Sequence, residues 1–551
     1  MKKRCSKLVA LLLTATMVFS FAGCGGSDAT GDVVGSETVE GSVKDGGTFV
    51  YGLEQNMLSL DPAFSYSLTT SIPISTFCES WLTTDPDDPS TLVPLLAEDW
   101  SVSEDGLVYT FNFRQGVHFW DGTELTAEDV VFSYNHVMDE SVASYVSWMH
   151  ASVESVEAID DYTVVVTLSE PDSTWLYSVA TSGGGVFSKA YYESLDDPST
   201  FGTANGGVMG TGAYVFDEWI EGEKVTAHAN PDYWDKDNQP KFDKVEWVEI
   251  PDGTTRITAI GNNEIQATYW NQATQLSMMQ AITAQGVELQ YNDAGTTQCL
   301  FLNTAREGLD DVNCRKALAY VFDTVSYTTG VYGDSATAGD SCFLPPALRT
   351  YNDEAWAAYN ETADAYSVDV EKAKELMAAS NYPEGFDMEI LVSTAFPTDE
   401  TAAVMLQEAA KQIGINITVT KVTPSERSEI IYAEARDYDA VIVQWDADFP
   451  ESLSDLIPMF YGENIKAGGC NYMNYDNETV NSLIAQAKAT TDNTEKGQLI
   501  TEICLQINED CPMIPLAYPS RISLVREEIS GYTATPTYWF EPFTRYLYYS
   551  E

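Results

Sequence analysis

Few side chains in this sequence form a pattern that is typical of catalysis or metal binding. The four histidines, at positions 118, 136, 150 and 228, are too far apart to form a local pair of metal ligands. The sequence contains no GxSxG, HExxH, P-loop or GxGxxG motif, and Gly210-Thr211-Gly212 lacks the third glycine of a dinucleotide fingerprint. Acidic residues are so abundant that two neighbouring carboxylates say little about acid–base catalysis. We therefore predict a protein that is not an enzyme and that has no metal or other cofactor.

The cysteines point to no metal centre either. Nine are present, with no CxxC pair and no zinc-ligand spacing. Seven lie beyond position 24, at positions 78, 299, 314, 342, 470, 504 and 511. We interpret these seven as buried, small apolar side chains, with a Cys504–Cys511 bridge as the alternative.

Composition and charge narrow the possible partners. The 551 residues carry 84 Asp and Glu against 28 Lys and Arg, a formal charge of −56. A surface for nucleic acid or for anionic lipid headgroups needs clustered basic residues, so both partners are disfavoured. With 44 % hydrophobic residues, the chain can build several cores. We therefore expect a soluble, acidic, globular protein of about three or four domain-sized units.

The first 45 residues predict export and anchoring. Four basic residues precede the apolar run 8–22, which is too short to span a bilayer comfortably. The run ends in Phe21-Ala22-Gly23-Cys24, which resembles a bacterial lipoprotein signal, cut before Cys24 and diacylated on its thiol. Two acyl chains suffice for stable anchoring. We expect a signal peptide at 1–23, a flexible tether at 24–45 and a protein held at the extracytoplasmic face of the cell membrane, with a plain secretory peptide as the alternative.

Mixed α/β elements follow the tether. Alternating apolar residues predict a strand over 107–113, and β-branched runs predict buried strands over 162–168 and 439–444. Thr126 stands three residues before Asp129, as in a capping box, and an apolar helical stripe follows. A second helix is predicted after Asp369. Strands interleaved with helices favour an α/β architecture.

Five blocks in order carry a family resemblance. The segment 97–137 runs from a strand through Arg114-Gln115-Gly116 and Trp120-Asp121-Gly122 into the capped helix. Further blocks lie at 210–234, 309–323, 373–386 and 438–445. Together they resemble family 5 solute-binding proteins, the extracytoplasmic dipeptide- and oligopeptide-binding components of ABC importers. Gln266 and Thr324 depart from the residues usual in the family.

The resemblance implies a two-lobed, periplasmic-binding-protein-like α/β fold of type II, with an extra domain inserted in the first lobe and a hinge between the lobes. The ligand would be enclosed between the lobes of a monomer that serves an ABC permease and its ATPase. The implied segments are lobe I at 46–80, 205–297 and 505–551, the inserted domain at 81–204, and lobe II at 298–504, with Ile514 to Tyr518 in lobe I.

The resemblance implies a specific ligand contact at one position. In peptide-binding members, an aspartate three residues after a tryptophan pairs with the α-amino group of the ligand. In Trp445-Asp446-Ala447-Asp448 that role falls on Asp448. Burying an unpaired ammonium would be costly, and a carboxylate placed beforehand offsets that cost. The backbone from Gln444 to Asp446 would pair with an extended peptide as an added strand.

Other ligand contacts are expected at Tyr66 and Ser67 in the first lobe and at Tyr269 and Trp270 near the lobe junction. The partner of the ligand's carboxylate has no assignment. An oligosaccharide is an alternative ligand, because many Tyr and Trp residues could stack on sugar rings, whereas the few histidines disfavour nickel or haem. Alternatives of another class are a tethered hydrolase acting on cell-wall peptides and a peptide sensor.

Overall fold

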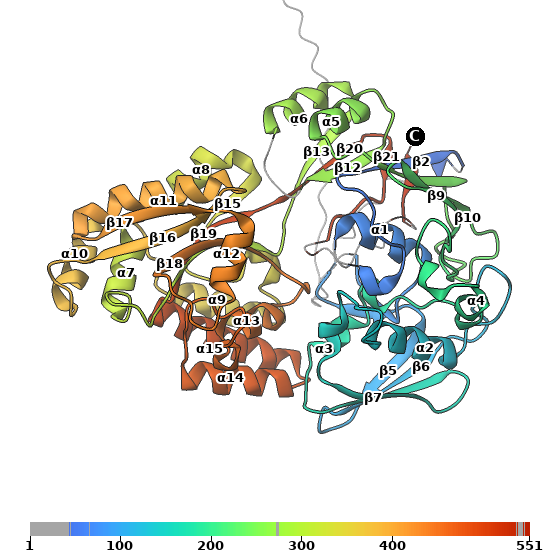
Figure 1. The fold of residues 1–551 in the computed structure, drawn as a ribbon, viewed down its shortest axis with the longest axis horizontal. Coiled ribbons are helices and arrows are strands. Elements are labelled where there is room, and N and C mark those ends of the chain that lie inside the picture. The colour runs from blue at the N-terminus through green and yellow to red at the C-terminus, as the bar shows by residue number, and fades with distance from the viewer. Residues whose placement is uncertain are drawn as a thin grey trace, which may run out of the picture. The chain divides into compact units, whose positions relative to one another are not determined.

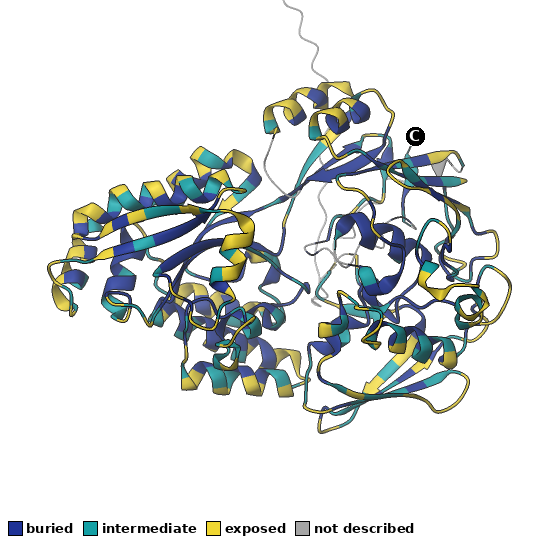
Figure 2. Cartoon of the chain, in the orientation of Figure 1, coloured by how far each residue is buried: buried dark blue, intermediate teal, exposed yellow. Residues whose placement is uncertain are grey.

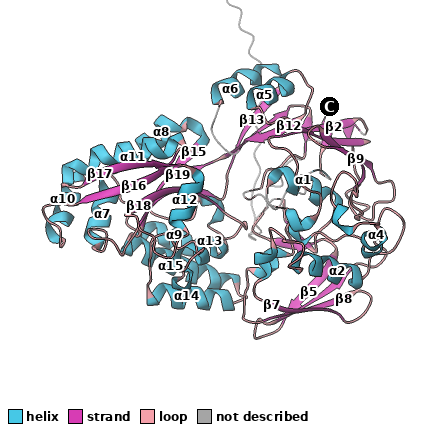
Figure 3. Ribbon diagram, in the orientation of Figure 1, coloured by secondary structure: helices cyan, strands magenta, loops and turns pink. Residues whose placement is uncertain are grey.

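Two large β-sheets organise the chain in the computed structural model (Figures 1 and 3). The structure describes residues 43–44, 46–65, 67–86, 88–270, 275–535, 537, 544 and 546–550. The predicted signal peptide, Cys24, most of the tether and Tyr66 lie outside the described residues. Residues 43–44, expected in the tether, form strand β1 (Val43–Lys44), which pairs with β22 (Tyr548–Ser550). In the part of the chain that is described, no helix is both long and apolar enough to cross a bilayer.

The seven-stranded sheet belongs to the first lobe. Its strands, in spatial order, are β13 (Val287–Asn292), β20 (Arg521–Arg526), β12 (Ala267–Trp270), β2 (Thr48–Leu53), β11 (Lys244–Glu249), β10 (Lys224–Ala229) and β9 (Tyr214–Ile220). Phe49, Tyr51 and Leu53 alternate along β2 and are buried in one core with helix α1 (Leu68–Phe77). Helices α5 (Gly253–Gly261) and α6 (Leu276–Ile282) enclose a smaller core with β12, β13 and β20. β21 (Ile529–Ser530) pairs with β22.

The Gly210-Thr211-Gly212 motif has a structural role. A Cβ atom on either glycine would collide with the backbone carbonyl oxygens of Phe77 and Thr76 at the end of α1. The two glycines therefore let the chain entering β9 pass against this helix. Thr211 is buried and its hydroxyl donates to Glu79 over 2.7 Å.

An additional antiparallel sheet lies within the segment 81–204. Its spatial order is β5 (Ala97–Val102), β6 (Val108–Phe113), β8 (Thr163–Leu168) and β7 (Val153–Ala158), with a small pair β3 (Leu82–Thr84) and β4 (Leu92–Pro94) beside it in sequence. Tyr109, Phe111 and Phe113 are buried together, which confirms the predicted face of this strand. Helix α2 (Ala127–Met138) begins with the predicted capping box of Thr126 and Asp129. The short helices α3 (Trp175–Ser178) and α4 (Lys189–Ser194) follow.

The six-stranded sheet forms the second lobe. Its order is β15 (Ala336–Ala338), β19 (Met513–Pro519), β14 (Thr296–Leu302), β18 (Ala440–Asp446), β16 (Asp387–Ser393) and β17 (Asn416–Val422). Ala440 and Ile442 of β18 enter one core, whereas Val441 and Val443 enter another, so both faces of the sheet are covered. Figure 2 shows this as buried strands between helices whose outer surfaces are exposed.

The helices of this lobe divide between the two cores. Those that contribute buried residues to the first core are α7 (Val312–Val321), α8 (Thr324–Val331), α10 (Val370–Ala379) and α11 (Pro397–Ala410). Those that contribute to the second are α9 (Asp353–Thr362), α12 (Pro424–Ile431), α13 (Ser452–Phe460), α14 (Glu478–Ala489) and α15 (Asn493–Asp510). α10 begins at the predicted cap Asp369, whose carboxylate accepts from the backbone of Lys372.

The two sheets are joined by a pair of antiparallel strands. The chain leaves the first sheet at the end of β13 and enters the second at β14, after three intervening residues. It returns from β19 to β20 across Ser520 alone. β13 pairs with β20, and β14 pairs with β19, so the outgoing and returning strands run side by side.

This crossover corrects the expected boundary of the second lobe. The stretch from Ile514 to Tyr518, expected in the first lobe, belongs to β19, which lies between β15 and β14 in the six-stranded sheet. The return to the first lobe therefore takes place at Ser520 and not near residue 505. The error arose because two consecutive strands with similar apolar patterns join different sheets.

All seven cysteines in the described chain are free, and six of them are buried. The interpretation as small apolar side chains is thus confirmed for these six, while Cys470 is partly exposed. The alternative bridge between Cys504 and Cys511 is not formed.

Candidate functional site

The end of strand β18 carries the residues expected at the ligand. Gln444, Trp445 and Asp446 are its last three residues and are all half-buried. On one side they pair with β14, where Asp446 lies opposite Thr296. The Thr296 hydroxyl donates to Asp446 Oδ1 over 2.7 Å. The end of β18 is therefore fixed next to the crossover between the two sheets.

The other edge of this strand end is open. Strand β16 pairs with β18 only at Ala440 and Val441. From Val443 to Asp446, no described strand pairs with the edge that faces away from β14. Backbone N–H and C=O groups on such an edge can pair with an extended chain.

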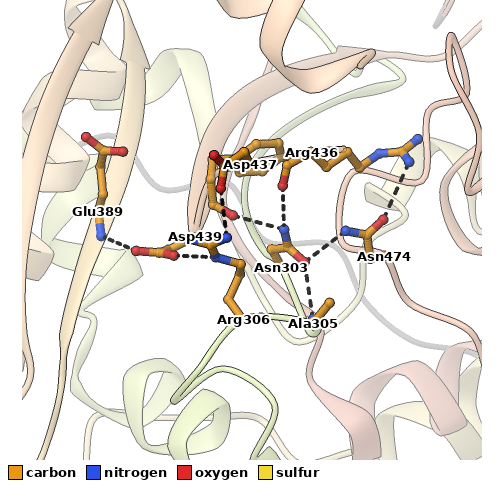
Figure 4. A network of polar contacts seen from close by, with 9 residues as sticks. Asn303, Ala305, Arg306, Glu389, Arg436, Asp437, Asp439 and Asn474 are labelled. Atoms are coloured by element: carbon orange, nitrogen blue, oxygen red, sulfur yellow. Dashed lines mark hydrogen bonds and ion pairs between the residues drawn. The ribbon is translucent and has the colours of Figure 1, made fainter. Parts of the chain in front are cut away.

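A polar network fixes the beginning of the same strand (Figure 4). Asp439 accepts from Arg306 Nε over 2.8 Å and from the Glu389 backbone N–H over 2.9 Å. The Asn303 side-chain amide donates to the carbonyls of Arg436 and Tyr438 over 3.0 and 2.9 Å. These bonds join the segment that follows β14 and strand β16 to the segment that precedes β18, and so they hold the beginning of β18 in place.

Acidic side chains gather where β18 ends and helix α13 begins. Trp445 Nε1 donates to Asp455 Oδ1 over 3.1 Å, and Asp455 is 1 % exposed. Burial raises the pKa of Asp455 well above its ordinary value, and the charges of Asp448, Glu451 and Asp446 raise it further. Asp448 is half-buried. A cation placed among these carboxylates would relieve their mutual repulsion.

Glu451 belongs to this cluster but is satisfied by the protein. It is fully buried, it caps α13 by accepting from the backbone N–H groups of Leu453 and Ser454, and it accepts from the Tyr351 hydroxyl over 2.9 Å. Glu451 and Asp455 therefore have structural roles within the protein. Contact of Asp448 and Asp446 with a ligand stays a prediction that comes from the family resemblance.

The remaining expected residues lie in the first lobe, away from the strand end. Ser67 is the half-buried N-cap of α1, in a capping box with Thr70. Tyr269 is 2 % exposed, and its hydroxyl lies 3.3 Å from Thr69 Oγ1. Trp270 is 4 % exposed and is covered by the guanidinium of Arg256, 4.3 Å from its ring centre. Both aromatic side chains are well packed within the lobe, and their contact with a ligand stays a prediction.

Sequence reasoning missed the buried ionisable residues. Arg256 lies 3.5 Å from Glu54, whose pKa burial raises. Glu54 directly follows the buried strand β2, and a polar residue at a strand end was the available signal. Asp455 and Lys496 lie within helices and gave no comparable signal, because their burial depends on contacts distant in sequence.

In the described part of the chain, no group of three His, Cys, Asp or Glu side chains is arranged to hold a metal ion.

Comparison with known proteins gives consistent matches over nearly the whole chain. The model of bacterial extracellular solute-binding proteins, family 5, matches residues 91–467. A Pseudomonas aeruginosa protein named probable di/tripeptide-binding protein 5 is 28 % identical over 81 % of this chain and 85 % of its own. The heme-binding protein A of Haemophilus influenzae is 26 % identical over 96 % and 97 % of the two chains.

The fold also matches a solved structure. HbpA2 from Haemophilus parasuis superposes with a TM-score of 0.81 at 25 % identity, covering 92 % of this chain and 100 % of that one. This similarity agrees with the predicted two-lobed α/β fold.

Proposed function

Because the chain belongs to family 5 of the bacterial extracellular solute-binding proteins, we propose that it binds short peptides between its two lobes and delivers them to an ABC permease and its ATPase. The di/tripeptide-binding name of the Pseudomonas relative supports the choice of peptide. The protein carries its ligand unchanged in this proposal.

The observation that carries the proposal is the acidic cluster at the end of β18. The charge of Asp448 acts on buried Asp455, and among the described residues no Lys, Arg or His side chain forms an ion pair with Asp455. The α-amino group of a peptide would supply that cation. We propose that it pairs with Asp448 and lies near Asp446.

The open strand edge supports the second half of the proposal. A peptide lying along Val443–Asp446 would gain backbone hydrogen bonds that do not depend on its sequence. Micromolar affinity corresponds to about −8 kcal/mol, which one ion pair and several such bonds can supply. Ser67, Tyr269 and Trp270 are proposed to line the same cleft from the first lobe.

The test is native mass spectrometry of the purified protein, followed by peptide titration of an Asp448→Asn variant. We expect co-purified peptides and a loss of affinity of roughly 100-fold or more, since breaking a buried pair costs about 3–5 kcal/mol. Asp437→Asn is the matched control, because that carboxylate is 83 % exposed and pairs with Arg306 at the opposite end of β18. Unchanged affinity in Asp448→Asn would contradict the site.

A non-peptide solute is the competing candidate, favoured by the match to the heme-binding protein A. The mass of the co-purified ligand separates haem, an oligosaccharide and a peptide. Cleaved peptides in the same spectrum would instead support a tethered hydrolase. A protein that binds peptide but does not support uptake would be a sensor.

Lipid anchoring at Cys24 belongs to the same proposal. Mass spectrometry of the membrane-extracted protein should find an amino-terminal residue Cys24 carrying a diacylglyceryl group. A Cys24→Ala variant should be released from the membrane while it keeps its affinity for peptide.

A further inference from the structure

A cavity of about 770 Å³ lies between the inserted domain and the second lobe. Tyr177, Ser90 and Trp100 contribute from the inserted domain, and Tyr351, Pro450 and Lys496 contribute from the second lobe. Its volume falls in the range of small-molecule sites in proteins. None of the residues assigned above to ligand contact lines it.

Lys496 is the unusual residue of this cavity. It is the fourth residue of α15 and only 4 % exposed. Its Nζ lies 4.9 Å from the centre of the Tyr351 ring, but among the described residues it has no hydrogen bond or ion pair within 4.0 Å. Burial lowers the pKa of Lys496, while the more distant charges of Glu451 and Asp172 favour its protonated form. An ammonium can donate three hydrogen bonds, and Lys496 lines the cavity, where an acceptor on a bound molecule could reach its Nζ.

The other charges around the cavity are already satisfied or exposed. Arg349 pairs with Asp340 over 2.6 Å. Asp88 is exposed and accepts from the hydroxyls of Ser90 and Thr91 over 2.7 Å each. Asp353 is exposed in the first turn of α9. The charged group of the cavity that has no ion-pair partner among the described residues is therefore the Lys496 ammonium. The cavity thus offers a cation to a ligand, although the chain has a formal charge of −56.

The cavity adjoins the proposed amino-terminal end of the ligand. Pro450, which lines it, lies two residues after Asp448. Tyr351 touches both sides of this boundary, since its hydroxyl donates to Glu451 of the acidic cluster and its ring lies under Lys496.

We infer that this cavity receives the side chain of the ligand's first residue and that Lys496 binds a carboxylate on that side chain. The inference rests on the proposed function and adds a preference to it: peptides that begin with an acidic residue bind more tightly than those that begin with the corresponding amide. The ligand's carboxylate supplies the acceptor that Lys496 lacks, while its α-amino group pairs with Asp448.

Calorimetric titration with Asp-Ala-Ala and Asn-Ala-Ala tests this preference. We expect the wild-type protein to bind Asp-Ala-Ala at least about tenfold more tightly. In Lys496→Met the two peptides should bind equally, with the affinity for Asn-Ala-Ala unchanged within about twofold. Lys496→Arg should keep a preference, because it keeps the charge. Ala-Ala-Asp and Ala-Ala-Asn should differ less than the first pair.

The outcomes separate the two proposals. Equal binding of Asp-Ala-Ala and Asn-Ala-Ala by the wild-type protein would overturn the role of Lys496 and leave peptide binding in place. A preference that survives in Lys496→Met would overturn it as well. If neither peptide binds, both proposals fail. The wild-type comparison needs no variant, so it decides the question even if Lys496→Met does not fold.

Discussion

Asn292 lies directly opposite Arg521 where the two crossover strands leave the first sheet, and its side-chain amide donates to the Arg521 carbonyl over 3.3 Å. The same amide also donates to the buried Ser523 hydroxyl over 3.1 Å. One side chain thus fastens the outgoing strand to the returning strand beside the junction between the lobes.

Replacing Asn292 by Ala should therefore destabilise the protein. Two hydrogen bonds are lost, and we expect a decrease of about 1–2 kcal/mol in the free energy of unfolding, measured by urea denaturation. Asn205→Ala is the control, since Asn205 is exposed and its side chain makes no hydrogen bond among the described residues. Equal stability of the two variants would contradict this role of Asn292.

A second prediction concerns the contact between the inserted domain and α14. Lys488 lies 2.9 Å from Glu170, and the Ser173 backbone N–H donates to the Lys488 carbonyl over 3.0 Å. Because these contacts join the two lobes, opening of the cleft would break them. Glu170→Gln should weaken ligand binding about twofold, in line with about 0.5 kcal/mol for an exposed pair, and leave the melting temperature unchanged.

Salt provides the check on that prediction. The difference between Glu170→Gln and the wild type should disappear near 1 M NaCl, where an exposed ion pair is screened. A difference that persists at high salt would show that the effect is not electrostatic.

A third prediction follows from Asp399. This carboxyl group is 1 % exposed, and burial raises its pKa to about 6, although Gln298 donates to it over 2.8 Å. In the unfolded chain an Asp titrates near pH 3.9, so between these values the folded state holds the proton and the unfolded state does not. The contribution of Asp399 to stability is therefore present below about pH 4 and is lost as the pH rises to about 6.

The measurement is the free energy of unfolding of Asp399→Asn minus that of the wild type. This difference should shift in favour of the variant by at most about 3 kcal/mol between pH 4 and pH 7, since two pKa units correspond to that amount. A difference independent of pH would show that Asp399 is charged at neutral pH without cost.

A fourth prediction concerns Trp445. Trp445→Phe removes the indole N–H that donates to buried Asp455, and should destabilise the protein by about 1–3 kcal/mol at pH 7. Adding Asp455→Asn to this variant should recover much of the loss, because the amide that replaces the buried carboxyl group cannot ionise and so does not depend on the indole N–H to ease its burial. The single variant Asp455→Asn keeps an oxygen acceptor for Trp445 and serves as the reference. Additive effects in thermal denaturation would contradict the coupling.

Local signals predicted much of the fold. The strand Val108–Phe113 alternates apolar and polar residues, and Thr126 with Asp129 marks the start of α2, so both were predictable from a few consecutive residues. The boundary of the second lobe could not be predicted in this way. The strands β19 and β20 have similar apolar sequences and differ only in the strands with which they pair.

The candidate site was predictable only in part. Gln444 to Asp446 end a recognisable buried strand. Asp448 was assigned through the resemblance to peptide-binding family members, and contact of these residues with a ligand stays a prediction. Lys496 lines a cavity together with residues from the segments around positions 100, 177 and 351, and the sequence around α15 alone does not contain that information. Whether a charged side chain is buried depends on segments that are distant in the sequence, so its burial cannot be predicted from neighbouring residues.

The paired crossover strands have one more consequence. Residues 296–519 form an uninterrupted insertion whose two ends, next to Asn292 and Arg521, are neighbours in space. Excising the insertion and joining Asn292 to Arg521 through an Asn-Gly turn would convert β13 and β20 into an ordinary β-hairpin. The second lobe is thus a modular unit. Evolution or protein engineering could replace it as a whole by remaking only two chain junctions, which lie next to each other.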